Sequence, residues 1–219
     1  LSAPIGEEIS KALAVLFLAR FIDSPKRGFQ IGFSVGLGFA LLENMIYILG
    51  SILAGEGAAI TFIFTAVLRA IGSIPGHATW TAISGYAIGH YVISKRWNER
   101  SLGVFDKSKT QQDSQWILFD GKTGQPMISS RTEKEVPLLP KWLSAGQNKM
   151  FKITDKPIKA VGIAILFHAI WNGSLWTISV ALQDTSIGIQ IFANLLITFT
   201  LIALLWTILR RLVPFAVLE

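Results

Sequence analysis

The sequence predicts an all-α fold, a polytopic bundle of about six transmembrane helices that carries one small polar insert. Two observations predict it. Hydrophobic residues make up 51% of the 219 residues, and the mean hydropathy is +0.50, which is high for a soluble domain. The apolar residues are also concentrated in runs almost free of charge, each long enough for a membrane helix of roughly 20 residues: 28–53, 58–94, 158–182 and 187–209.

Residues 1–94 are predicted to hold four of the membrane helices. The first helix runs from 4 to 22, because its leading proline suits a first helical turn and the string Asp23-Ser24-Pro25 would end it. The second helix covers 28–51 and closes at the turn Gly55-Glu56-Gly57.

The run from 58 to 94 is too long for one crossing of the membrane. Gly72, Pro75 and Gly76 interrupt it, and proline breaks helical hydrogen bonding. We therefore predict two separate helices here and two more after the insert, with the ranges 58–72, 76–94, 157–182 and 187–212.

Glycine pairs at four-residue spacing recur along these helices, and small residues let membrane helices approach closely. The pairs are Gly32 and Gly36, Gly72 and Gly76, and Gly85 and Gly89. We expect them to pack helices together and to carry no chemistry.

The stretch 95–157 differs from its surroundings, because it is polar and rich in Lys, Gln, Ser and Asp. It divides the chain into membrane helices over 1–94, an insert over 95–157 and membrane helices over 158–219. Residues 115–127 predict a β-hairpin within the insert, with Asp120-Gly121-Lys122-Thr123-Gly124 as its turn.

Basic residues predict the orientation of the chain in a cell membrane. Most lie in or beside the insert, and Arg210 and Arg211 fall on the same side if there are six crossings. The opposite side would hold only Lys26 and Arg27, with Arg20 near a helix end. By the positive-inside rule the insert and the C-terminus are cytoplasmic. The net charge of +6 thus indicates contact with the lipid bilayer, and no recognition motif indicates a nucleic-acid partner.

Ionisable residues stand inside the apolar helices. A charged side chain at the centre of a bilayer costs about 2.5–3.5 kcal/mol on insertion scales, so such residues face the bundle interior and mark functional sites. They are Glu7, Glu8, Lys11, Glu43, Arg69, His77, His90 and His168. His90 lies near the end of its helix, and we expect it at the membrane interface.

The spacing of these residues groups several of them on shared helix faces. Glu7 and Lys11 are four residues apart, and so are His168 and Asn172. A structural ion pair is the alternative explanation for the first pair, and a hydrogen-bonded core histidine for the second. We expect Lys11 and Arg69 to support the site, with Arg69 as the counter-charge of a glutamate.

Four strings, in order along the chain, resemble the PrsW family of intramembrane proteases. They are Glu7-Glu8-Ile9-Ser10-Lys11, Gly38-Phe39-Ala40-Leu41-Leu42-Glu43-Asn44, Pro75-Gly76-His77-Ala78 and His168-Ala169-Ile170-Trp171-Asn172. The resemblance covers the first five predicted helices, and neither the insert nor the last helix adds to it. It implies an intramembrane endopeptidase that hydrolyses a membrane-anchored protein, such as an anti-sigma factor.

The PrsW family looks like a distant relative of the CAAX prenyl proteases, which have a double-glutamate motif, a Phe-x-x-x-His motif and a late His-x-x-x-Asn motif. Here Phe39-x-x-x-Glu43 stands in place of the second motif, with Glu instead of His. His168-x-x-x-Asn172 matches the third. A third carboxylate at Glu43 would orient water or complete a metal site.

The catalytic residues that the resemblance implies are Glu7, Glu8, Glu43, His77, His168 and Asn172. Glu7 would be the general base that activates water, and Glu8 would hold Lys11 or a histidine. His168 and Asn172 would be the donors that stabilise the oxyanion. Peptide hydrolysis requires these types of group, with an acid for the leaving amine as well.

Two alternatives use the same residues. A zinc-dependent intramembrane metalloprotease would take Glu8, Glu43, His77 and His168 as ligands, whose types and number suit zinc. A proton- or cation-coupled transporter also keeps Glu and His in broken helices. No inverted repeat is visible, because the glutamates cluster early and the His-x-x-x-Asn motif stands alone. This pattern argues against the transporter.

Overall fold

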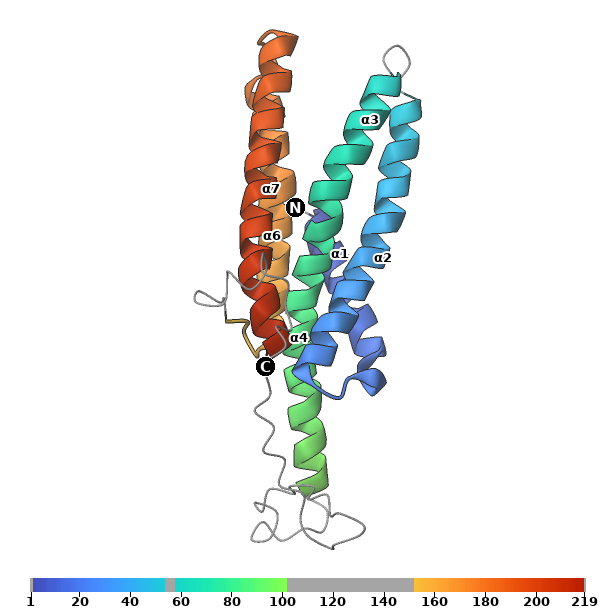
Figure 1. Cartoon of the computed structure of the whole chain (residues 1–219), viewed down its shortest axis with the longest axis vertical. Coiled ribbons are helices and arrows are strands. Elements are labelled where there is room, and N and C mark those ends of the chain that lie inside the picture. Colours follow the sequence, from blue (N-terminus) through green and yellow to red (C-terminus); the bar gives the residue numbers. More distant parts are fainter. Residues whose placement is uncertain (1, 54–57, 102–151, 219) are drawn as a thin grey trace, which may run out of the picture.

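The structure is a computed structural model that describes residues 2–53, 58–101 and 152–218. All secondary structure in these residues is helical, with no strand among them, which confirms the predicted all-α class. The helices pack lengthwise into one elongated bundle (Figure 1). The hairpin predicted over 115–127 lies outside the described residues.

Helix α1 covers Ser2–Phe17 and leads through a 3-10 turn, Ala19–Phe21, into helix α2, Pro25–Ile52. The Ser24 hydroxyl caps α2 by accepting a hydrogen bond of 3.2 Å from the backbone N–H of Arg27. A proline occupies the first turn of α2, where no N–H is needed. The string that we expected to end the first helix therefore also begins the second.

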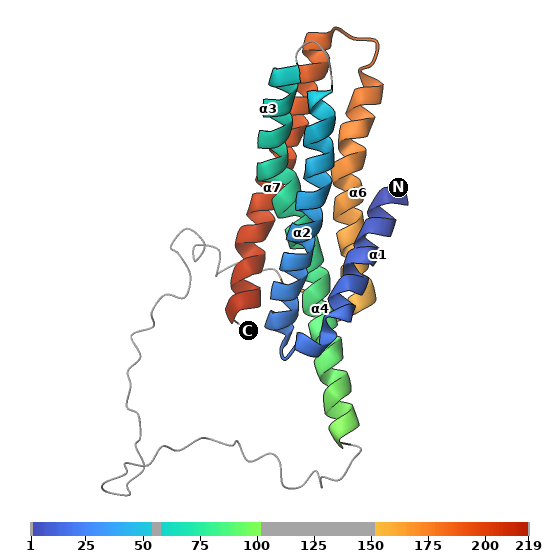
Figure 2. The same cartoon turned by 90° about the vertical axis from the view of Figure 1, so that its right-hand side faces the viewer.

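Helix α3, Ala58–Leu68, and helix α4, Ile74–Ser101, are joined by a π-helical turn over Arg69–Ser73. The three segments follow one another as a single continuous rod (Figure 2). The predicted separation into helices over 58–72 and 76–94 is therefore wrong. Pro75 and its flanking glycines change the helical hydrogen-bonding pattern without ending the helix.

The helix continues through Pro75 because a residue on α7 supplies the hydrogen-bond donor that proline lacks. Pro75 has no N–H to offer the carbonyl of Ile71, four residues before it. The indole N–H of Trp206 donates to that carbonyl at 3.2 Å. Membrane helices tolerate proline in this way when other groups satisfy the freed backbone atom.

Helix α6, Pro157–Ala181, and helix α7, Ile187–Leu218, form the second half of the bundle. Among the described residues, three helices are long and apolar enough to cross a membrane, and their spans are Pro25–Ile52, Pro157–Ala181 and Ile187–Val213. These lengths and compositions confirm that the fold is a bundle of membrane helices, whereas the predicted number of about six crossings stays a prediction.

Helices α2 and α4 meet along a glycine seam in which their backbones nearly touch. A Cβ added at Gly36 would lie only 2.3 Å from the carbonyl oxygen of His77. A Cβ added at Gly85 would lie 2.3 Å from the carbonyl oxygen of Gly28. Such distances are well inside van der Waals contact, so these positions admit only glycine. The predicted close approach is confirmed for the glycine pairs at 32 and 36 and at 85 and 89, and it fixes the backbone of His77 against α2. A Cβ added at Gly72 or Gly76 would instead meet a tryptophan ring.

Basic residues gather at one end of the bundle. The junction of α1 with α2, the ends of α4 and α7 and the start of α6 all lie at that end (Figure 1). The guanidinium of Arg96 ties two of these elements, because it donates to the carbonyls of Ile22 at 2.5 Å and Ala19 at 2.7 Å. Lys26 and Arg27 therefore lie at the same end as the last turns of α4 and the start of α6, and our expectation that they face the opposite side from the basic residues there is wrong.

This arrangement predicts the labelling pattern of single cysteines introduced into a chain that has none. We expect Asp23→Cys and Asp155→Cys to share one accessibility to an impermeant thiol reagent in intact cells, and Ser186→Cys to have the opposite one. The reason is that Ser186 lies in the connection between α6 and α7, at the far end of the bundle. Equal labelling of Asp23→Cys and Ser186→Cys, with Asp155→Cys protected, would contradict the arrangement.

Candidate active site

Helix α1 brings three charged side chains toward the interior of the bundle. Glu8 and Lys11 are buried, with 1% and 2% of their surface exposed, and they lie on the same face of α1 as the buried Ala12 and Val15. Glu7 is partly exposed, with 22% of its side chain accessible. The inner face of this helix is therefore charged, which is costly in a membrane protein unless partners are present.

The partners of Glu8 come from its own helix and from α6. The ammonium of Lys11 donates to Glu8 Oε1 at 2.8 Å, and His168 Nδ1 lies 3.0 Å from the same oxygen. A carboxylate oxygen only accepts, so His168 donates from Nδ1. Its Nε2 then accepts a hydrogen bond from the Asn172 amide at 3.1 Å. Asn172 and His168, the predicted pair on one face of α6, thus form a series of hydrogen bonds that ends at Glu8.

His77, on α4, joins α1 to α2. Its Nδ1 accepts a hydrogen bond of 2.7 Å from the Lys11 ammonium, and its Nε2 lies 2.9 Å from Glu43 Oε2. Because an ammonium can only donate, Nδ1 carries the lone pair and Nε2 carries the proton. A neutral imidazole satisfies both contacts. Each of the two site histidines therefore donates one ring N–H to its own glutamate.

Arg69 anchors Glu43 from the π-helical turn. Its guanidinium donates to Glu43 Oε2 at 2.8 Å and to the hydroxyl of Ser73 at 3.2 Å, and its Nε donates to the side-chain oxygen of Asn44. The guanidinium also lies over the ring of Tyr47, 3.8 Å from its centroid. Glu43 is thus the glutamate that lies beside the Arg69 guanidinium. π-helical turns are often found at functional sites.

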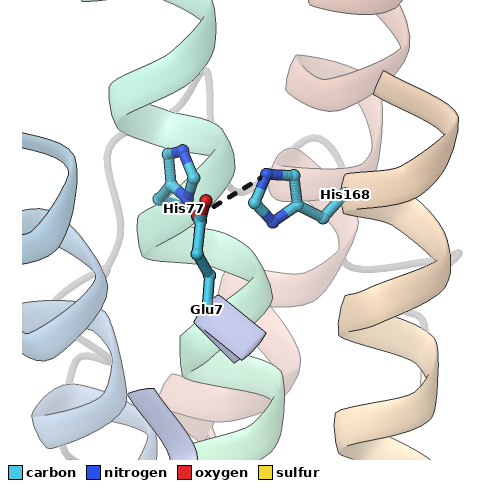
Figure 3. A group of neighbouring side chains, drawn as sticks. All are labelled: Glu7, His77 and His168. Atoms are coloured by element: carbon cyan, nitrogen blue, oxygen red, sulfur yellow. Dashed lines mark ion pairs between the residues drawn. The ribbon is translucent and has the colours of Figure 1, made fainter. Parts of the chain in front are cut away.

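Glu7 faces the two histidines across the centre of the site (Figure 3). Its Oε2 lies 3.8 Å from His168 Nε2 and 3.5 Å from Lys11 Nζ. This oxygen is buried and has no hydrogen-bond partner. One donor atom from each of Glu7, His77 and His168 lies within 4.8 Å of the others, close enough for a common metal ion. Glu7, rather than Glu8 or Glu43, is thus the carboxylate grouped with both histidines.

Aromatic rings enclose the histidines. Trp80 stacks on His168, with ring centroids 5.0 Å apart, and meets His77 edge-on at 5.3 Å. Phe39 lies beneath Lys11, whose Nζ is 3.9 Å from the ring centroid. Trp80 follows His77 by three residues and so shares its helix face. His90 lies outside this group and contacts Tyr86 instead, at 4.8 Å.

The formal charges of the site do not cancel. Three carboxylates, Glu7, Glu8 and Glu43, face two basic side chains, Lys11 and Arg69, and both histidines make the contacts of neutral imidazoles. One negative charge is therefore left in a largely buried group. Such a group favours an additional proton or a bound cation.

The fold and this site define a helical membrane protein with a buried centre of carboxylates and histidines from α1, α2, α4 and α6. Residues 1–108 match the family model described as PrsW family intramembrane metalloprotease. A curated relative, Protease PrsW from Geobacillus kaustophilus (strain HTA426), is 33% identical over 101 residues. Residues 1–108 of the chain are thus similar to the PrsW family.

These matches cover only part of each chain. The aligned region spans 44% of this chain and 40% of the curated relative. The family-model match over residues 1–108 includes the glutamate motifs and His77, whereas His168 and Asn172 lie beyond it. The place of those two residues in the site therefore comes from the structure. No solved structure matches the chain.

Proposed function

We propose that this protein is an intramembrane endopeptidase that hydrolyses peptide bonds of a membrane-anchored protein. The observation that carries the proposal is the Glu7 carboxylate, whose unpartnered oxygen faces two buried histidines inside a membrane fold. Glu43 Oε2 is held by an ion pair with Arg69. Glu8 also has one unpartnered oxygen, but only 1% of its side chain is exposed, against 22% for Glu7, so Glu7 is the carboxylate that water can reach. The match to a protease family over residues 1–108 supports the same activity.

In the proposed reaction Glu7 takes a proton from a water molecule as the water oxygen attacks the carbonyl carbon of the substrate. The proton then passes to the leaving amine as the carbon–nitrogen bond breaks. Asn172 is the proposed donor to the oxyanion, through the amide N–H that does not bond to His168 Nε2. His168 would become a second donor once its Nε2 has taken up a proton. Glu8 orients His168 from behind, since its Oε1 lies 3.0 Å from His168 Nδ1. Glu43 does the same for His77, with Nε2 and Oε2 2.9 Å apart.

The same residues fit a metal ion, which the description of the family includes. Glu7, His77 and His168 would hold it, because a carboxylate and two imidazoles are a common set of zinc ligands. Each histidine already donates its other N–H to a glutamate, the arrangement that usually supports a metal-bound histidine. The surplus negative charge of the site also favours a cation. When bound, zinc would polarise the substrate carbonyl and acidify water.

The test of this function is cleavage of a single-span membrane protein by the purified full chain in liposomes. We expect two fragments by mass spectrometry, loss of activity after chelation and recovery after one equivalent of zinc. Undiminished cleavage by a preparation shown to be metal-free would exclude the metal and leave the glutamate mechanism. Absence of cleavage at every zinc concentration, for a panel of single-span substrates, would contradict the protease.

The proposed orientation places the insert and the C-terminus in the cytoplasm, because the basic residues lie at that end of the bundle. The proposed substrate is a membrane-anchored regulator such as an anti-sigma factor, which the resemblance to the family implies. A substrate of this kind would reach the site from within the bilayer.

A further inference from the structure

Lys11 occupies the centre of the site. Its ammonium donates to Glu8 Oε1 at 2.8 Å and to His77 Nδ1 at 2.7 Å, and it lies 3.5 Å from Glu7 Oε2. The side chain is buried, and its charged end rests on the ring of Phe39. This lysine therefore contacts two of the three residues that would hold a metal ion.

The hydrogen bond from Lys11 to His77 prevents a metal ion from binding the same ring nitrogen. The proton of His77 is on Nε2, which faces Glu43 at 2.9 Å, so Nδ1 is the only ring nitrogen with a lone pair to offer. A single lone pair cannot both accept a hydrogen bond from an ammonium and coordinate a metal ion. Lys11 must withdraw from His77 before a metal can bind there.

We propose that Lys11 is the resident cation of the site and competes with a metal ion for His77 and Glu7. This inference rests on the proposed metal ligands. The ion pair between Lys11 and Glu8, at 2.8 Å, does not involve His77, so the ammonium can leave Nδ1 and keep its strongest partner. Lys11 thus sets the affinity of the site for metal and lets the same side chains form a stable, closed cluster without one.

The test is a zinc titration of the full chain in detergent by isothermal calorimetry. We expect Lys11→Met to bind zinc at least about tenfold more tightly than the wild type, because no ammonium has to be displaced from the ring nitrogen. Removal of one positive charge would by itself raise the affinity for a cation. Arg69→Met is therefore the matched control, because it removes one charge from the same cluster but contacts Glu43 and not Glu7 or His77.

A gain confined to Lys11→Met supports competition at His77. An equal gain in both variants would overturn it, because charge alone would then explain the change, and so would an unchanged affinity or a lack of zinc binding in all proteins. Lys11→Gln serves as a second variant if Lys11→Met does not fold. This readout is independent of proteolysis, so failure of the cleavage assay and failure of the competition are separate results.

Discussion

Replacing Glu7 by Gln is expected to lower the rate of substrate cleavage by about 10²–10⁴, the usual contribution of a general base. Glutamine keeps the size and polarity of the side chain but cannot take a proton from water. Glu7 is partly exposed and its Oε2 has no hydrogen-bond partner, so the variant should insert and fold as the wild type does. Initial rates in liposomes, with equal amounts of protein, measure the loss.

Two other carboxylates give this experiment its controls. Asp184, in the exposed connection between α6 and α7, should tolerate Asn without change in rate. Glu8→Gln should also reduce cleavage, but by loosening His168 and Lys11, whose contacts it holds, so its thermal stability should fall as well. Wild-type rates in both Glu7→Gln and Glu8→Gln would refute the protease and favour a transporter.

Replacing Gly36 by Ala is expected to cause the largest loss among substitutions that change no polar group. The added Cβ would lie 2.3 Å from the carbonyl oxygen of His77, and backbone atoms on both sides cannot move aside cheaply. Overpacking of this kind costs about 1–3 kcal/mol. The helices must separate, and a displacement of roughly 1 Å at His77 can lower turnover about 100-fold. Thermal unfolding and cleavage rates should therefore fall together.

Gly38 is the matched control on the same helix, two residues further along. A Cβ added there meets nothing within 4 Å. Gly38→Ala should keep both the wild-type unfolding temperature and the wild-type cleavage rate, or gain slightly in stability, since Ala favours the helix over Gly. Equal behaviour of the two variants would mean that the glycine seam does not position His77.

Residue spacing within single helices was enough to predict several contacts of the candidate site. The spacing of Glu7, Glu8 and Lys11 within one helix already predicts contacts among them, because residues three and four apart share a helix face. The same rule joined His168 to Asn172. Charge inside apolar segments then separated these residues from ordinary core positions.

Contacts between side chains on different helices could not be predicted from residue spacing. Glu8 contacts His168 across 160 positions and Lys11 contacts His77 across 66, and no periodicity within one helix indicates such partners. Our expected metal ligands included Glu8 and Glu43, whereas the carboxylate grouped with the histidines is Glu7. Which glutamate lies behind a histidine and which lies beside it depends on how the helices rotate against one another.

The continuation of the helix through Pro75 could not be predicted from the neighbouring residues either. Proline and its neighbouring glycines normally predict a helix end. Here the helix continues because Trp206, more than a hundred residues away in sequence, donates to the carbonyl of Ile71. The consequence reaches the site itself, since the continuous π turn positions Arg69 beside Glu43.

The long sequence separation between Glu8 and His168 also sets when the site can exist during biosynthesis. Ribosomes add about 5–20 residues per second, so the codon for His168 is read roughly 10–30 s after that for Glu8, 160 positions earlier. Until α6 has been made and inserted, a nascent chain holds the whole family segment but no donor for the Glu8 carboxylate from α6. The proposed proteolytic activity would therefore arise only late in synthesis, after the insert has been translated.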